Sequence, residues 1–63
     1  MKNKRVRKAM LDAGINQQQL AEILGYTESE MSIILNRVEI AVKEQNDIVA
    51  RVREWDALRQ GVS

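Results

Sequence analysis

The chain has 63 residues, with ten Lys and Arg against nine Asp and Glu, and it contains no Cys and no His. This composition excludes disulfides, thiolate or imidazole metal sites, and catalysis by Cys or His. A chain this short predicts a single domain, residues 1–63, that needs closely packed helices or a partner to be stable. The absence of Pro and the 30% of charged residues favour a helical globular domain over a disordered chain.

The basic residues are distributed unevenly. Residues 2–8 hold five of the ten, whereas residues 9–36 hold four acidic residues and no Lys or Arg. Charged contacts to a polyanion are therefore expected from the two ends of the chain. No apolar run approaches the roughly 18 residues of a membrane span, and no signal-peptide core is present, so a cytoplasmic protein is expected.

Apolar spacing and helix-end residues predict an all-α fold of four helices, at about residues 3–13, 17–24, 28–37 and 43–58. In the first, apolar residues recur at i, i+3, i+4 and i+7, from Val6 to Ala13, which places them on one face. Gly14 is expected to end this helix, with Ile15 supplying the hydrophobic contact that often accompanies such an end. Residues 38–42 are β-branched and short, which predicts an extended connection.

The second and third helices each begin with the pattern of a capping box. Asn16 stands three residues before Gln19, and Thr27 stands three residues before Glu30. Gly25 is expected to end the second helix, and the small Ala21 allows another helix to approach closely. Two short helices joined by a tight turn containing Gly predict a helix-turn-helix unit over residues 17–36.

Successive residues of a helix are about 100° apart, so the third helix has two distinct faces. An apolar face, expected to point to the core, comprises Met31, Ile34, Leu35 and Val38. An outward face, with Arg37 at its edge, comprises Ser29, Ser32, Ile33 and Asn36.

Each residue of the outward side has both a functional and a structural interpretation. Ile33 could contact a thymine methyl group, or it could be an ordinary surface hydrophobe. Asn36 could pair with adenine, although the interpretation as a helix cap is favoured. Glu28 could accept a hydrogen bond from cytosine or complement the helix dipole. Ser29 and Ser32 could bond bases or phosphates, or be plain surface residues.

The start of the second helix offers a further contact. Gln17 and Gln18 open this helix, whose free N–H groups suit a phosphate. They are equally acceptable as solvent-facing helix formers. In the last helix, Ile48, Val52 and Trp55 form a stripe, and Trp55 is expected in the core. Leu58 and Val62 lie beyond that stripe and are candidates for a dimer interface.

The spacing of six residues resembles the pattern of phage repressor and Cro-type (lambda-repressor-like) helix-turn-helix proteins: Leu20, Ala21, Gly25, Thr27, Met31 and Ile34. The resemblance covers about residues 4–52. It implies that residues 28–36 enter the major groove of operator DNA and that the protein acts as a homodimer. The DNA contacts that it implies fall on Gln17, Thr27, Glu28, Ser29, Ser32, Ile33 and Asn36.

The chain departs from the family pattern at two places. Family members often carry a buried ion pair between an Arg late in the first helix and a Glu late in the third, where this chain has Met10 and Leu35. Replacing both partners by apolar residues is tolerated, whereas replacing one is costly, so the paired change supports the fold. Arg37 stands where the family usually has Gly, and it could reach a phosphate.

The sequence therefore predicts a transcriptional regulator that binds duplex DNA specifically as a homodimer. Bases would be read by Glu28, Ser29, Ser32, Ile33 and Asn36. Phosphates would be held by Gln17, Gln18, Thr27 and Arg37. The alternative, favoured by the acidic helix-turn-helix segment, is a protein-protein interaction module with the same fold. Neither an enzyme nor a cofactor, metal or small-molecule site is expected.

Overall fold

The computed structural model describes residues 2–61, and this part of the chain contains four helices and no strand. They are α1 (Lys4–Ala13), α2 (Gln17–Leu24), α3 (Glu28–Arg37) and α4 (Val42–Arg59). Each begins and ends within one residue of its predicted bounds, and the all-α fold class is confirmed. Val62, named above as an interface candidate, lies outside the described residues. None of the described helices has the length and apolarity needed to cross a membrane.

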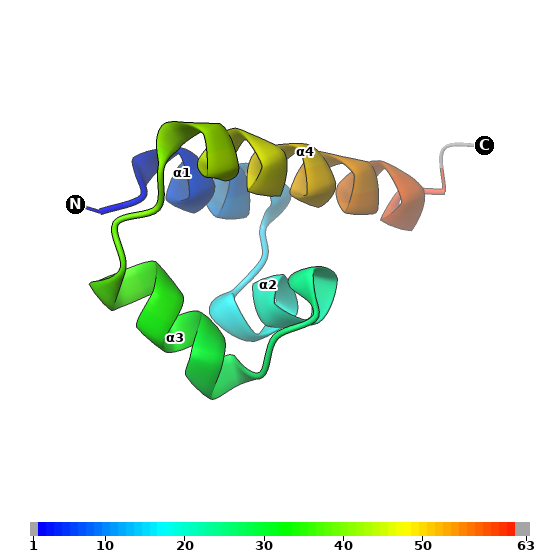
Figure 1. The fold of residues 1–63 in the computed structure, drawn as a ribbon. Coiled ribbons are helices and arrows are strands. Elements are labelled where there is room, and N and C mark those ends of the chain that lie inside the picture. Colours follow the sequence, from blue (N-terminus) through cyan, green and yellow to red (C-terminus); the bar gives the residue numbers. More distant parts are fainter. Residues whose placement is uncertain (1, 62–63) are drawn as a thin grey trace.

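The helices form two layers, with α1 beside α4 in one and α2 beside α3 in the other (Figure 1). The core lies between the layers, and its fully buried side chains come from all four helices: Val6, Leu20, Met31, Leu35 and Val52. Ala21 is only 2% exposed, as the close helix approach predicted there requires. Met10 and Leu35 both belong to this apolar cluster.

The first two helices end in glycines with left-handed backbone conformation, as predicted. Gly14 has φ 68°, and the N–H of Ile15 donates to the carbonyl of Met10 at 3.0 Å. Ile15 is buried, so the hydrophobic contact expected at this helix end is present. Gly25 has φ 81°, and the N–H of Tyr26 donates to Ala21 O at 2.8 Å. These bonds satisfy carbonyls that a helix end would otherwise leave free.

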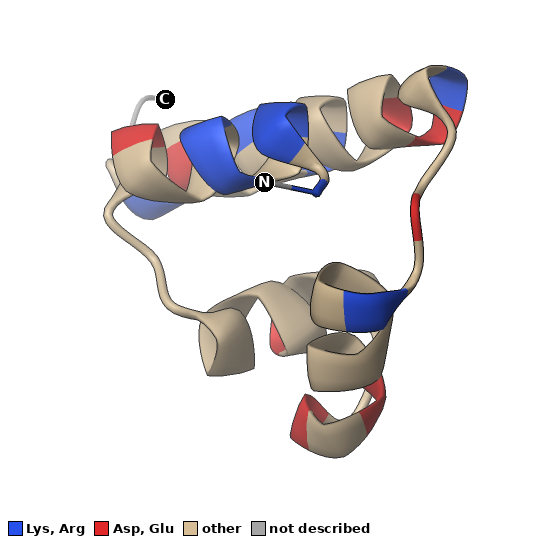
Figure 2. Cartoon of the chain, turned by 90° about the vertical axis from the view of Figure 1, so that its left-hand side faces the viewer, with Lys and Arg blue, Asp and Glu red and all other residues tan. Residues whose placement is uncertain are grey.

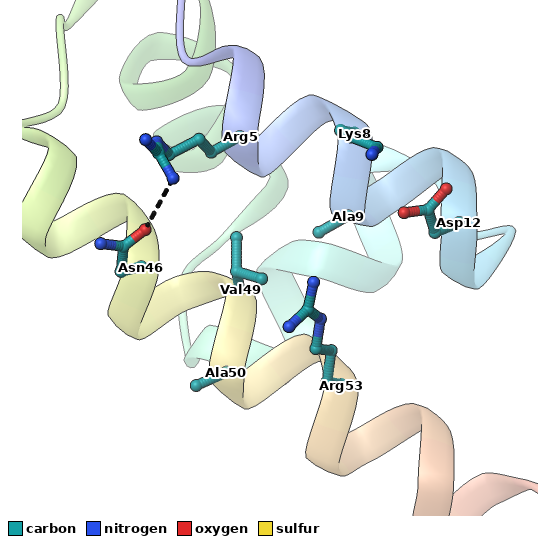
Figure 3. Close-up of a pocket in the computed structure, with 8 residues that line it drawn as sticks. All are labelled: Arg5, Lys8, Ala9, Asp12, Asn46, Val49, Ala50 and Arg53. Carbon is teal, nitrogen blue, oxygen red and sulfur yellow. Dashed lines mark hydrogen bonds between the residues drawn. The ribbon is translucent and has the colours of Figure 1, made fainter.

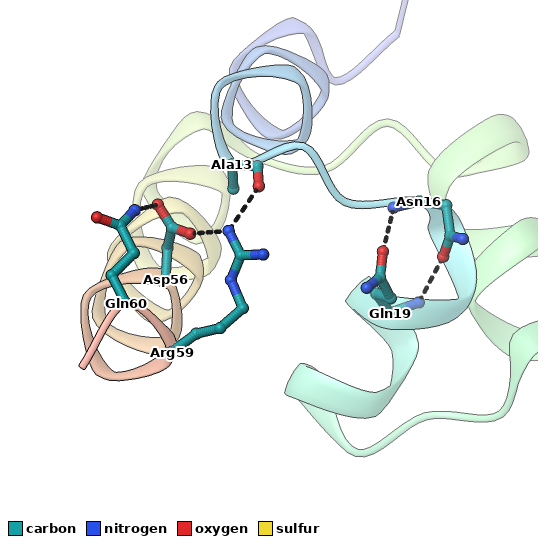
Figure 4. A network of polar contacts seen from close by, with 6 residues as sticks. All are labelled: Ala13, Asn16, Gln19, Asp56, Arg59 and Gln60. Carbon is teal, nitrogen blue, oxygen red and sulfur yellow. Dashed lines mark hydrogen bonds and ion pairs between the residues drawn. The ribbon is translucent and has the colours of Figure 1, made fainter.

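Both predicted capping boxes are present. The amide of Gln19 donates to Asn16 Oδ1 at 2.8 Å, and the amide of Asn16 donates to Gln19 Oε1 at 3.0 Å (Figure 4). At α3, the amide of Glu30 donates to Thr27 Oγ1 and that of Thr27 donates to Glu30 Oε1, both at 3.1 Å. The hydrogen bonds from the Thr27 amide and hydroxyl lower the pKa of Glu30, because they favour its ionised form.

The end of α4 is attached to the end of α1 by Arg59. Its Nη2 donates to Ala13 O at 3.2 Å and pairs with Asp56 (Figure 4). Its guanidinium lies 5.0 Å from the centre of the Trp55 ring. Gln60 Nε2 also donates to Asp56, at 3.0 Å. The hydrogen bond from Arg59 holds the pKa of Asp56 below its usual value. Trp55 packs against the core, as predicted, whereas Leu58 is 71% exposed.

Two buried amide side chains, which the sequence did not reveal, hold the α3–α4 connection in place. Asn3 Nδ2 donates to the carbonyls of Leu35 and Val38 at 3.0 and 2.9 Å, and its Oδ1 accepts from Ile40 N at 2.9 Å. Gln45 Nε2 donates to Ile40 O at 2.8 Å, and its Oε1 accepts from the amide of Arg5 at 3.3 Å. Hydrogen bonds from Asn3 and Gln45 thus tie the N-terminus and the start of α4 to the same α3–α4 connection.

Three predicted details of these segments are wrong. Asn3 is not helical but precedes α1 with φ 58°, a left-handed conformation that Asn tolerates. Val42 belongs to α4 rather than to the extended connection. Val38 does not face the core and is 45% exposed, because α3 ends at Arg37 and the backbone of Val38 is extended.

Candidate nucleic-acid interface

Five of the nine predicted contact residues line one shallow depression of about 360 Å³ on the helix-turn-helix unit: Gln17, Glu28, Ser29, Ser32 and Ile33. Gln17 is the first residue of α2, and the other four lie on the first two turns of α3. The spacing of these four along α3, at i, i+1, i+4 and i+5, puts them on one side of the helix. The capping box at Thr27 fixes where that helix begins and therefore which side they share.

The depression combines an apolar group with polar ones. Ile33 is 53% exposed, so a large β-branched side chain projects from the outward side of α3. Ser29 and Glu28 are exposed and Ser32 is half-buried, which places hydroxyl and carboxylate groups around it. Such a surface can make hydrogen bonds to the edges of bases and an apolar contact to a methyl group.

Four predicted contact residues lie outside the depression. Gln18 is exposed on α2, and Arg37 is the exposed last residue of α3. Thr27 precedes α3, where its hydroxyl oxygen accepts from the amide of Glu30. The same hydroxyl also bonds the Glu30 carboxylate, so the side chain of Thr27 is already engaged in the α3 capping box.

Asn36 is not the helix cap that its position favoured. Val38 caps α3, while Asn36 Nδ2 donates to Ser32 O at 2.9 Å within the helix. Asn36 Oδ1 accepts from Arg7 Nη2 at 2.8 Å. A bidentate pairing with adenine uses both amide groups, and each of them already has one partner within the protein. Asn36 is therefore exposed, but its side chain is held toward α1.

Arg7 is a site residue that the sequence reasoning missed. Its Nη2 donates to Leu35 O at 3.2 Å as well as to Asn36, and its Nε donates to Lys2 O at 2.9 Å. Lys2 Nζ in turn donates to Arg37 O at 3.4 Å. Cations near the last carbonyls of a helix are favoured by its dipole. No local pattern in the sequence could have indicated contacts between residues 28 to 35 positions apart.

These contacts make the charge along α3 asymmetric. Its first turn carries Glu28 and Glu30, whereas its end carries Arg37 (Figure 2). The side chains of Lys2 and Arg7 bond the end of α3 as well. The carboxylates lie near the positive end of the helix dipole and the cations near the negative end, which stabilises both. Positive charge available for phosphates therefore lies beside the C-terminal end of α3 and not beside the depression.

Two other basic residues of the N-terminal segment face α4. Arg5 and Lys8 line a cleft that also contains Arg53 of α4 (Figure 3). Lys4 lines a second cleft, together with Lys2 and Arg5. The basic segment of residues 2–8, contiguous in the sequence, is thus spread over several places on the molecule. Among residues 2–61, no group of three or more His, Cys, Asp or Glu side chains is placed to hold a metal ion.

Comparisons of the chain with protein-family models, with curated proteins and with solved structures find no match. The structure defines a small four-helix domain with a central helix-turn-helix unit.

Proposed function

We propose that the protein is a transcriptional regulator of the lambda-repressor-like helix-turn-helix class, which binds duplex DNA specifically with α3 in the major groove. The observation that carries this proposal is the depression where Gln17 of α2 meets the outward side of α3. The major groove admits an α-helix, and the first turns of a recognition helix supply the base contacts. The first two turns of α3 carry the four exposed or half-buried residues of the depression.

In this mode of binding, the residues of the depression have separate roles. Ile33 contacts a thymine methyl group, and the hydroxyls of Ser29 and Ser32 bond base edges or nearby phosphates. Glu28 accepts from the amino group of cytosine. We assign base reading to these residues rather than to Asn36, because its amide is bonded to Arg7 and to Ser32 O.

Phosphates are contacted at two places, the start of α2 and the C-terminal end of α3. At the start of α2, Gln17 and Gln18 stand beside free backbone N–H groups, which attract a phosphate. Arg37 and Lys2 supply charge at the C-terminal end of α3. One protomer thus makes few charged contacts. A homodimer on two half-sites one helical turn apart multiplies the affinity.

A selection of bound sequences from a random duplex library tests the proposal. We expect a palindromic consensus, bound with an affinity that falls steeply as salt rises, because binding releases counterions. Failure to enrich any sequence, together with no binding of duplex DNA at low salt, would overturn it.

Ile33 provides the residue-level test on the selected duplex. Ile33→Ala should weaken binding by about tenfold, or roughly 1.4 kcal/mol, because the apolar contact with the thymine methyl group is lost. Val42→Ala is the matched control, because Val42 is similarly exposed, at 54%, but lies at the start of α4. Equal affinity of the Ile33 variant and the wild type would show that Ile33 is an ordinary surface residue without a base contact.

A second candidate function is a protein-protein interaction module. It is favoured by the absence of Lys and Arg from residues 9–36 and by an apolar groove of about 410 Å³ between α3 and α4. Tyr26 and Val38, each 45% exposed, line that groove. The DNA selection separates the two functions, since an interaction module would enrich no sequence.

A further inference from the structure

A cleft of about 420 Å³ lies between α1 and α4, and none of its lining residues comes from α2 or α3. Figure 3 shows its side chains in front of the α1–α4 layer, with the helix-turn-helix unit behind. Its floor is small and apolar, formed by Ala9, Val49 and Ala50. Its rim is polar and comprises Arg5, Lys8, Asp12, Asn46 and Arg53. We refer to these eight residues as the α1–α4 cleft.

Helical spacing brings the rim residues together. Arg5, Lys8 and Asp12 stand at i, i+3 and i+7 of α1, which places them on one face. Asn46 and Arg53 stand two turns apart on the facing side of α4. The rim therefore combines three cations with a single carboxylate, and its net charge is +2 (three minus one).

None of these three cations has an anionic partner in the described chain. Within residues 2–61, the one ion pair with a nitrogen–oxygen distance of 4.0 Å or less is Arg59 with Asp56. Arg5 Nη1 contacts only the neutral oxygen of Asn46, at 3.5 Å. Like charges that share a concave surface raise its local potential, which attracts and concentrates a counter-ion.

The walls of the cleft are held at both ends. Near its start, the amide of Arg5 donates to the buried Gln45 of α4 at 3.3 Å. Beyond its other end, Arg59 of α4 donates to Ala13 O of α1 at 3.2 Å. The cations thus project from a framework whose two helices are already fixed. Pre-organisation of this kind reduces the entropy lost on binding.

We propose that the α1–α4 cleft binds an oligophosphate, a small anion with two or more linked phosphate groups. Its volume falls within the roughly 300–1,000 Å³ of small-molecule sites. Guanidinium groups bond phosphate oxygens in bidentate fashion, and Lys adds a point charge. Three cations carry more positive charge than a single phosphate group would neutralise, which favours an anion with several phosphates. DNA on α3 would lie against the other layer, so its phosphates would not face Lys8 and Arg53. The cleft is therefore independent of the proposed DNA-binding function.

Titration of the ¹⁵N-labelled protein with pyrophosphate, tripolyphosphate and a nucleoside triphosphate, at constant ionic strength, tests this proposal. We expect saturable amide shifts centred on the α1–α4 cleft, with tighter binding of tripolyphosphate than of pyrophosphate. Equal affinity for tripolyphosphate and the nucleotide would assign recognition to the phosphates alone. Tighter binding of the nucleotide would add a contact between the nucleoside and the apolar floor.

Three substitutions make the test specific. Lys8→Gln and Arg53→Gln should each weaken oligophosphate binding by about tenfold, the effect of one charged hydrogen bond. Asp12→Asn should strengthen it, because the only carboxylate on the rim is removed. Arg51→Gln is the matched control: it removes the same charge from α4, but Arg51 lines the α3–α4 groove instead.

Three results would overturn the proposal. One is an effect of Arg51→Gln equal to that of Arg53→Gln. Another is a set of shifts spread over basic residues throughout the protein. The third is a response of the cleft to duplex DNA alone, which would assign these cations to a nucleic-acid backbone. If the Lys8 and Arg53 variants keep the DNA selectivity of the wild type, the cleft and the α3 interface are separate sites, and each proposal can be tested independently of the other.

Discussion

At the scale of single residues, two buried amides organise the loop on which the position of α3 depends. Asn3 and Gln45 are 4% and 7% exposed, and their hydrogen bonds satisfy backbone groups between Leu35 and Ile40. No buried side-chain nitrogen or oxygen among residues 2–61 lacks a partner. Removing either amide would therefore leave buried backbone groups unpaired.

Asn3 allows the hydrogen bonds to be separated from the backbone conformation. Asn3→Gly keeps the left-handed conformation accessible but removes three hydrogen bonds, and we expect a loss of about 1–3 kcal/mol in the free energy of unfolding. Asn3→Ala should lose roughly 1 kcal/mol more, because Ala disfavours a positive φ. Urea unfolding followed by circular dichroism measures both, and wild-type stability of Asn3→Gly would contradict the assigned role.

Ala21 tests the packing of the helix-turn-helix unit. It is 2% exposed on α2, a helix that contacts both α3 and α4. Ala21→Leu should lower the free energy of unfolding by about 1–3 kcal/mol through overpacking. Ala57→Leu on α4 is the control, since Ala57 is exposed and Leu is a good helix former. Equal stability of the two variants would argue against a close approach at Ala21.

At the scale of elements, the beginnings and ends of the helices decide which side of α3 faces outward. The two capping boxes fix the first residues of α2 and α3, and Gly25 turns the chain between them. If α3 began one residue earlier or later, the side chains that line the depression would be rotated by about 100° around the helix axis. These local hydrogen bonds therefore stabilise the helices and also set which side of α3 faces outward.

The α3 capping box gives a pH-dependent prediction. The Thr27 amide and hydroxyl lower the folded-state pKa of Glu30, so its stabilisation is fully present above the unfolded pKa, about 4.3. It is lost as the pH falls through the lower folded pKa. Glu30→Gln keeps a capping side chain that does not titrate. The wild type should therefore be the more stable at neutral pH, and the difference should shrink in acid.

Urea unfolding of both proteins across this range measures the difference. The lowered pKa of Asp56 adds acid sensitivity to both proteins equally and cancels in the comparison. A difference that stays constant from neutral pH into acid would contradict the role of the ionised carboxylate.

At the scale of the whole molecule, the two layers separate two surfaces of different charge. The α2–α3 layer carries the neutral-to-acidic depression, and the α1–α4 layer carries the cleft with three cations. Lys2 and Arg37 lie at the border beside the end of α3. The net charge of the chain is only +1, but the separation of the two surfaces concentrates three cations on one of them.

The salt dependence of DNA binding should reflect this separation. Arg37→Gln should reduce the slope of log affinity against log salt by about 1 per protomer, because one phosphate contact is lost. Arg53→Gln should leave the slope unchanged, since Arg53 lies in the other layer. Titrations at several salt concentrations measure the slopes, and a reduction of equal size in both variants would contradict the proposed orientation on DNA.

The sequence by itself determined the helices, the capping boxes and the glycine ends, because each depends on residues within about four positions of one another. It also placed Ser29, Ser32 and Ile33 on one face of α3, and all three line the depression.

Only the tertiary structure decided how Asn36 and the basic N-terminus are used. Asn36 carries the pattern of a cap, but Arg7, 29 positions away, bonds its oxygen. Arg5 and Arg7 are two residues apart in the sequence, yet one enters the cleft and the other contacts α3. Side chains two apart on a helix point in widely different directions, and what each meets depends on how the layers pack.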